Sequence, residues 1–356
     1  MATRSIPNTG VAAQPPEQLA LTTRLRPIHY WSGLGAVFVL VQIYVYGSWI
    51  FSGDLYRQPT GADPVPTAIK AAAWIVQATC VLGAVVLVIY LWRRSRREGK
   101  LAWDALVAIA FASVYWQDPV IDFARPVFFY NSYLINFGAW TSHIPGWLSP
   151  YAANLPEPFL MILPMFAWLF VVFGMLFCAM ARRLRRIRPN IGKVGIFLTG
   201  VLVFGVFNIV MEAVFLQTRL FAYSGVINSV SLFSGHVYQF PLYEALIAGV
   251  NASVVGMIRL TRDDRERSAV ERGVDELQVS PKTQTSLRIL AVVGLANTMF
   301  VVMNLVYIAF TFYVDRMPHY PSYLKNDMCG VAVSAPCPGP GVPVLIDNTP
   351  HRTGHR

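Results

Sequence analysis

Five carboxylic acids lie within or beside apolar runs of this sequence, where an ionisable side chain is costly. Asp118 and Asp122 lie in WQDPVIDF, Glu157 in NLPEP, Glu212 in FNIVMEAVF and Glu244 in YQFPLYEAL. At the centre of a bilayer such a group costs at least about 2.5 kcal/mol, so it normally has a partner or a function. Paired carboxyl groups suit acid–base chemistry, because a low dielectric keeps one group protonated while a better solvated neighbour is ionised.

The composition indicates where these acids must be held. Of the 356 residues, 55% are hydrophobic and only 13% are charged, against about 25% charged in soluble globular proteins. The mean hydropathy is +0.46. These values exclude a soluble enzyme, a disordered regulator and a small disulfide scaffold, and they predict an all-α, polytopic transmembrane helix bundle.

Apolar runs of about 18 residues or more mark membrane-spanning helices. We expect seven spans, at about 30–50, 71–92, 101–118, 158–181, 193–215, 237–258 and 287–313.

Basic residues follow directly on several of these runs and predict the orientation. With the N-terminus inside, the inner segments 1–29, 93–100, 182–193 and 259–288 hold 21 of the 29 Lys and Arg residues. This distribution follows the positive-inside rule and predicts an N-in, C-out protein of the cell membrane. The net charge of +10 is therefore attributed to cytoplasmic loops, and no nucleic-acid partner is expected.

The same pattern divides the chain into three regions. We expect a polar cytoplasmic N-terminal arm (1–29), which does not resemble a cleaved signal peptide, a transmembrane domain (30–313) with a long outer loop (119–157), and a Pro/Gly-rich extracytoplasmic tail without regular structure (314–356). Cys329 and Cys337 lie in the tail, where a local disulfide is compatible with the oxidising side.

The predicted topology brings the five acids to one level. The third and fifth spans run outward and the fourth and sixth run inward, so all five fall in the outer third of the bilayer or just above it. Asp118 and Asp122 share a face if their helix continues past Pro119. Asp104 lies apart, at the inner end of the third span, within reach of Lys100 or lipid headgroups.

Aromatic and small polar residues are interleaved in the outer loop and at the start of the sixth span. Tyr130, Asn131 and Trp140 belong to the loop, and Tyr238 and Gln239 precede the sixth helix. An interfacial aromatic belt is one interpretation of these residues, and a substrate-binding surface is the other.

Other chemistries are less well supported. The six His residues show no ligand spacing, no nucleophile elbow is present, and neither a Walker loop nor a dinucleotide fingerprint occurs. We expect neither a metal nor a cofactor, although haem ligation by His143 or His236 stays open.

The segments WQDPVIDF, FFYNSYLINFGAW, HIPGW with SPYAANLPEP, FNIVMEAVF and YQFPLYEAL resemble the AveC-like spirocyclase family of actinobacterial membrane proteins. The resemblance covers the central third of the chain. It implies a role in secondary metabolism, namely spiroketal formation from a dihydroxyketone on a polyketide-like or lipid-like substrate, with loss of water; some members also act as dehydratases.

This chemistry fits the acids, and their roles are assigned from burial and chemistry alone. We expect Glu244 and Glu212 to form the acid–base pair, with Asp118 and Asp122 as supporting carboxylates. We expect the substrate to be oriented by Tyr130, Asn131, Trp140, Tyr238 and Gln239.

Two alternatives stay open. A membrane terpenoid-type cyclase would use the same acids to protonate an alkene or epoxide, and a non-enzymatic lipid-binding or transport protein would leave its ligand unchanged. The expected partners are an apolar small molecule and membrane lipid, and the oligomeric state is unknown.

Overall fold

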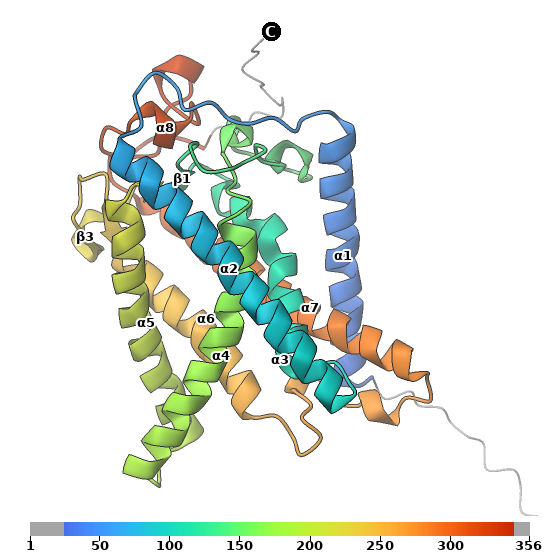
Figure 1. Ribbon diagram of the computed structural model, residues 1–356. Helices are drawn as coiled ribbons and strands as arrows, with labels where there is room; N and C mark the ends of the chain where they lie inside the picture. Colours follow the sequence, from blue (N-terminus) through green and yellow to red (C-terminus); the bar gives the residue numbers. More distant parts are fainter. Residues whose placement is uncertain (1–24, 345–356) are drawn as a thin grey trace, which may run out of the picture.

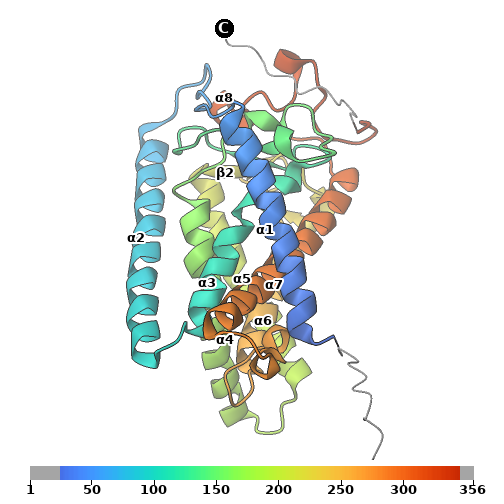
Figure 2. The same cartoon turned by 90° about the vertical axis from the view of Figure 1, so that its right-hand side faces the viewer.

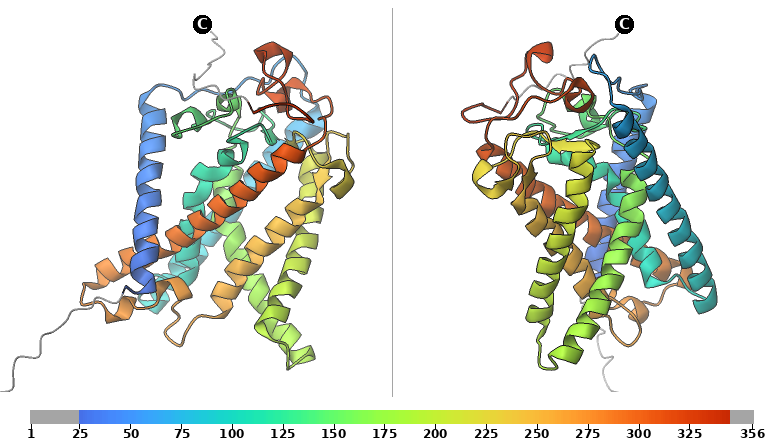
Figure 3. Two further views of the ribbon diagram at one scale, coloured as in Figure 1. Left: turned by 180° about the vertical axis from the view of Figure 1, so that it is seen from behind. Right: turned by 60° about the vertical axis from the view of Figure 1, so that its left-hand side comes forward.

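The computed structural model describes residues 25–344 and is mainly helical (Figure 1). Six of its helices are long and apolar enough to cross a membrane: α1 (Pro27–Phe51), α2 (Thr67–Glu98), α4 (Ile162–Ile187), α5 (Lys193–Gln217), α6 (Leu242–Leu260) and α7 (Pro281–Phe310). They form a bundle with α2 at one edge (Figure 2) and with α7 crossing it obliquely (Figure 3). The predicted helical membrane bundle is confirmed.

The third of the seven predicted spans does not form one long helix. Residues 101–118 give a ten-residue helix α3 (Trp103–Ala112), which continues as the 3₁₀-helix η1 (Ser113–Asp122). Pro119 lies inside η1, and it lacks the N–H that an α-helix needs and disfavours α geometry in the preceding residue. The described chain therefore has six long spans, with α3 and η1 packed among them.

One end of the bundle, called the basic end here, carries the α2–α3, α4–α5 and α6–α7 connections (Figure 1). Two of the Arg-rich segments form the ends of α2 and α4, and the third extends from the end of α6 into the α6–α7 connection, so the structure groups at this end the charges that predicted the cytoplasmic side. Which end faces the cytoplasm stays a prediction, as do the boundaries of the three regions.

The prediction that Asp104 reaches Lys100 or lipid headgroups is wrong. Asp104 contacts neither Lys100 nor solvent, since its side chain is buried and pairs with Arg94 of α2 at 2.6 Å and with Arg259 of α6. A buried carboxylate needs a paired cation. The two guanidinium groups supply it and connect three helices at this end.

The opposite end carries the cap, defined as residues 119–161, 218–241 and 314–344. Its strands β1 (Phe128–Tyr130) and β2 (Phe221–Tyr223) pair antiparallel, as do β3 (Ser231–Leu232) and β4 (Phe240–Pro241). The described chain also contains the short 3₁₀-helices η2 (Thr141–His143), η3 (Ala152–Asn154), η4 (Asn228–Val230), η5 (Ala269–Glu271), η6 (Val274–Glu276), η7 (Thr311–Tyr313) and η8 (Val331–Val333).

The predicted absence of regular structure in the tail is wrong for its described part. Residues 314–344 contain α8 (Ser322–Lys325) and η8, and a disulfide joins Cys329 to Cys337. Burial of Tyr320 and Tyr323 in the core of the cap fixes this segment despite its Pro and Gly content. The rest of the tail, and residues 1–24 of the N-terminal arm, lie outside the described residues.

A reciprocal contact fastens the tail to the α1–α2 connection. The Ser322 N–H donates to Asp63 Oδ2 at 2.7 Å, and the Asp63 N–H donates to Ser322 Oγ at 2.8 Å. The hydrogen bonds from Ser322 hold the pKa of Asp63 below its ordinary value.

Close contact between α5 and α6 positions two of the predicted acids. A Cβ on Gly249 would overlap the carbonyl oxygen of Val201, and one on Gly205 would lie 2.9 Å from that of Ala245. Small residues allow helix backbones to approach in this way. Because the two helices are antiparallel, the contact brings Glu212 of α5 beside the first turn of α6.

Candidate active site

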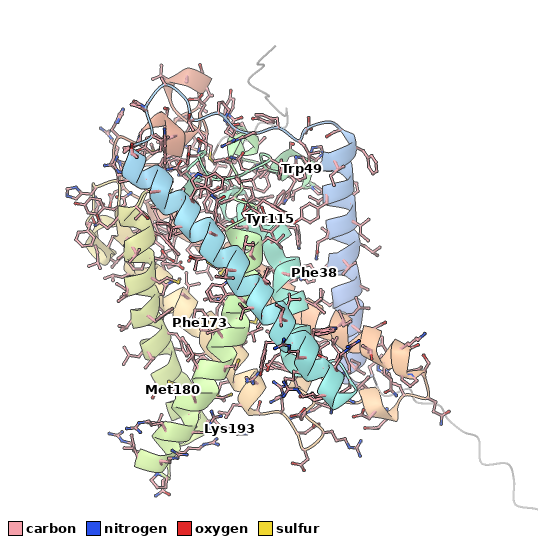
Figure 4. The ribbon with its side chains drawn as sticks, viewed as in Figure 1. Phe38, Trp49, Tyr115, Phe173, Met180 and Lys193 are labelled. Atoms are coloured by element: carbon pink, nitrogen blue, oxygen red, sulfur yellow. A yellow bond between two sulfur atoms is a disulfide. The ribbon has the colours of Figure 1, made fainter. Side chains whose placement is uncertain are left out.

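A cavity of about 180 Å³ lies among α4, α5, α6, α7, η1 and the β1–β2 ribbon. Phe173, one of its lining residues, lies about midway along the bundle (Figure 4). Of the 25 lining residues, 16 are apolar, including eight Phe and four Met. The polar lining residues are three acids, three tyrosines and three asparagines: Asp118, Glu212, Glu244, Tyr130, Tyr223, Tyr307, Asn208, Asn251 and Asn304. Such a lining suits a mainly apolar ligand with a few oxygen functions.

Glu212 and Glu244 form one polar centre of the cavity. The Tyr223 hydroxyl donates to Glu212 Oε2 at 2.7 Å, and Asn208 Nδ2 donates to Glu212 Oε1 at 3.0 Å. The carboxyl group of Glu244 lies beside that of Glu212, and Glu244 Oε2 makes no hydrogen bond in the described chain. A bond between two carboxyl groups requires a proton on one of them, because two carboxylates have no donor between them. A proton on either glutamate would therefore join the two carboxyl groups next to an apolar space.

Asp118 and Glu157 form a second centre. The Tyr130 hydroxyl donates to Asp118 Oδ2 at 2.6 Å, and the carboxyl group of Glu157 lies beside that of Asp118. Asp118 comes from η1, and Glu157 comes from the loop that precedes α4. Both centres thus combine two carboxyl groups with one tyrosine hydroxyl.

The β1–β2 ribbon supplies both tyrosines. Its register pairs Phe128 with Tyr223 and Tyr130 with Phe221, so the pleat places all four rings on one face. All four line the cavity, and the Phe128 ring stacks on that of Phe221 with centroids 4.7 Å apart. The ribbon therefore closes the cavity with aromatic rings and delivers one hydroxyl to each centre.

Asp122, the fifth of the predicted acids, does not line the cavity. Asp122 is buried, and its Oδ1 accepts from the N–H groups of Val127 at 2.6 Å and Phe128 at 3.0 Å, which fixes the turn into β1. Residues four apart do not share a face in a 3₁₀-helix, which has three residues per turn. The predicted common face of Asp118 and Asp122 is therefore not formed.

The predicted substrate-binding residues are placed differently from one another. Tyr130 lines the cavity, whereas Trp140 lines a second cavity. Asn131 donates to the Arg219 carbonyl and Gln239 to the Tyr223 carbonyl, so both brace the cap. Tyr238 stacks on His236 outside the cavity lining. Their functional roles stay predictions.

Two contributors to the centres were not predicted. Tyr223 has no local signal, since its position follows from pairing with a strand more than 90 residues earlier in the chain. Asn208 lies four residues before Glu212 in the same helix, so the i, i+4 spacing indicated a shared face.

The histidines considered for haem have other contacts. His143 hydrogen-bonds Ser48 at 2.8 Å and Asp54 at 2.9 Å, and His236 stacks on Tyr238. Among residues 25–344, no group of three or more His, Cys, Asp or Glu side chains is arranged to hold a metal ion.

The fold and the cavity define a polytopic helical membrane protein with paired carboxyl groups around an apolar chamber. The chain belongs to the family described as Spirocyclase AveC-like, whose model matches residues 93–320, more than half of the sequence. The match begins near the end of α2 and includes both carboxyl centres and the ribbon. Membership supports a spirocyclase-type function in general. No curated protein and no solved structure matches the chain.

Proposed function

We propose that this protein is a spirocyclase of the cell membrane that forms a spiroketal from a dihydroxyketone on a polyketide-like or lipid-like chain, with loss of one water. The observation that carries the proposal is the arrangement of two carboxyl centres, each with a tyrosine hydroxyl, around one largely apolar cavity. An apolar substrate that partitions into the bilayer matches this lining.

The Glu212–Glu244 centre supplies the acid. One hydroxyl of the substrate adds to its ketone and gives a cyclic hemiketal. The proton shared by the two glutamates passes to the hemiketal hydroxyl and the C–O bond breaks. Water leaves, and an oxocarbenium ion remains. Tyr223 and Asn208 then hydrogen-bond the carboxylate that remains.

The Asp118–Glu157 centre supplies the base. The aromatic faces of Phe128 and Phe221 and the negative charge of this centre stabilise the oxocarbenium ion. The second hydroxyl attacks the cationic carbon and gives its proton to Asp118. The released water and the tyrosine hydroxyls return that proton to the glutamates, so the cycle closes with one spiroketal and one water formed.

The test compares metabolite and lipid extracts of a deletion strain with those of strains restored with wild type or a variant. We expect the deletion strain to accumulate a precursor heavier than the missing product by one water, and only an active protein to clear it. An accumulating isomer of the product would replace the proposal with a terpenoid-type cyclase. A compound that changes place without chemical change would replace it with transport.

The variants separate acid–base chemistry from folding. Glu244→Gln keeps the size of the side chain and removes the exchangeable carboxyl proton, and we expect it to lower turnover about 100-fold or more. Glu276→Gln, at an exposed ion pair with Arg26 on the basic end, serves as the matched control and should keep full activity. Full activity of a folded Glu244→Gln protein would remove the Glu212–Glu244 centre from the mechanism.

A further inference from the structure

A second cavity, of about 330 Å³, lies beside the first, and the Asp118–Glu157 pair stands between them. Asp118 lines the first cavity and Glu157 lines the second. The second cavity borders α1, the junction of α3 with η1, and the cap; its lining residues Trp49 and Tyr115 lie toward the cap end of the bundle (Figure 4). The proposed cyclisation gives this space no role.

Aromatic rings form much of its wall. Six of the 13 lining residues are aromatic: Tyr46, Trp49, Tyr115, Phe137, Trp140 and Phe159. The Trp140 ring meets those of Tyr46, Trp49 and Tyr115 edge to face, with centroids 4.9, 5.4 and 5.0 Å apart. These contacts hold the aromatic side chains as one rigid group.

A buried acid without a matching cation faces this group. Glu157 is 1% exposed, and neither of its oxygens receives a hydrogen bond from a fixed donor of the described chain. No Lys, Arg or His lines the cavity. Two carboxyl groups that share one proton carry one net negative charge. A buried charge of this kind is costly unless a counter-charge neutralises it.

Two donors without acceptors complete the site. Gln42 Nε2 and Trp49 Nε1 belong to lining residues, are buried, and make no hydrogen bond in the described chain. Buried donors normally have a partner, so an occupant with an acceptor oxygen would satisfy them.

We propose that the second cavity binds an organic monocation of the amino-alcohol type, with a quaternary or protonated amine and an oxygen close to it. The aromatic rings and the Asp118–Glu157 pair hold the cationic group, as aromatic cages hold quaternary ammonium ligands. Gln42 and Trp49 donate to the oxygen. The binding does not depend on the cyclisation proposed for the first cavity.

The test measures binding of choline to the purified full-length protein by equilibrium dialysis. Its neutral carbon isostere, 3,3-dimethylbutan-1-ol, has the same shape and hydroxyl group without the charge. We expect choline to bind at least about tenfold more tightly than the isostere, because the isostere loses the cation–π and charge interactions. Equal binding of the two compounds, or no binding of choline, would overturn the proposal.

Variants assign the binding to this cavity. Glu157→Gln should weaken choline binding about tenfold, and Trp49→Leu should weaken it more than Trp49→Phe does, because Phe keeps the aromatic ring and loses only the N–H donor. Glu244→Gln, in the other cavity, should leave choline affinity unchanged. Thermal unfolding shows which variants are folded, and the Trp49 pair keeps the test decisive if Glu157→Gln does not fold. Equal affinity of Trp49→Leu and Trp49→Phe would contradict the aromatic site.

A competition experiment identifies the source of the cation. Dihexanoyl phosphatidylcholine carries the same group on a phosphate ester. Displacement of labelled choline by this lipid at lower concentration than by free choline would assign the cavity to a lipid headgroup, and the reverse order would assign it to a free amino alcohol.

Discussion

Removal of one hydroxyl group, by Tyr223→Phe, tests the Glu212–Glu244 centre directly. The Tyr223 side chain is buried, and its hydroxyl donates to Glu212 Oε2 at 2.7 Å. The substitution keeps the ring, which lies in the aromatic face of the ribbon, and leaves the carboxyl oxygen without this donor. It therefore isolates the hydrogen bond from the packing.

The expected cost follows from the burial of both partners. A hydrogen bond to a charged group contributes about 1.5–3 kcal/mol, and the loss of one partner leaves a buried acceptor unsatisfied. Asn208 still donates to the other oxygen of Glu212, which keeps the loss near the lower end of that range. We expect Tyr223→Phe to reduce the free energy of unfolding by about 1.5–2 kcal/mol.

The assay is reversible unfolding in mixed micelles, followed by tryptophan fluorescence, in a double-mutant cycle with Glu212→Met. In the Met background the donor has no acid to bind, so Tyr223→Phe should cost at least about 1 kcal/mol less. Tyr243→Phe is the matched control, because its ring stacks on Phe310 and its hydroxyl makes no hydrogen bond in the described chain. An equal cost of Tyr223→Phe in both backgrounds would refute the reasoning.

Three further changes test the elements that position the site. Gly249→Ala sets a methyl group against the backbone of α5 and should lower the melting temperature and the activity together, whereas Gly33→Ala, in open space on α1, should leave both unchanged or slightly raise stability. Replacement of Cys329 and Cys337 by Ser should destabilise the tail by about 2–3 kcal/mol, the loop entropy for a separation of 8 residues, and should speed its proteolysis; an unchanged cleavage rate would contradict this. Acid should loosen the same tail. The pKa of Asp63 is lower in the folded protein than its ordinary value, so the stability that Asp63 contributes is present above the ordinary Asp pKa and is lost as the pH falls through the folded pKa. Amide exchange at Ser322 should report this loss in wild type but not in Asp63→Asn.

Much of the bundle could be predicted because an apolar run of sufficient length already specifies a spanning helix. Hydropathy does not register the backbone effect of Pro119, and so the third run was taken as a full span. The same 3₁₀ geometry separates Asp118 from Asp122, which a 3.6-residue period would have placed together.

The candidate site was predicted in part, for reasons that differ by residue. Glu212 and Glu244 could be placed at one level from the directions of their spans, and the structure brings them into contact. The pairing of Asp118 with Glu157, and the delivery of Tyr223, depend on cap segments that meet only in the folded chain. Tail residues such as Tyr323 gave no periodic signal, because the cap fixes them by burial.

The two-residue repeat of the β1–β2 ribbon makes the alignment of its strands decisive for the hydrogen bonds that Tyr130 and Tyr223 donate. A slip of β1 by one residue would turn Phe128 and Tyr130 to the outer face and present Phe129 inward, which removes the donor to Asp118. A slip of β2 would do the same to Glu212 by withdrawing Tyr223. No intermediate alignment exists, since strands pair only in whole steps. The contacts that hold the register of the ribbon therefore also determine whether each carboxyl centre receives its tyrosine hydroxyl.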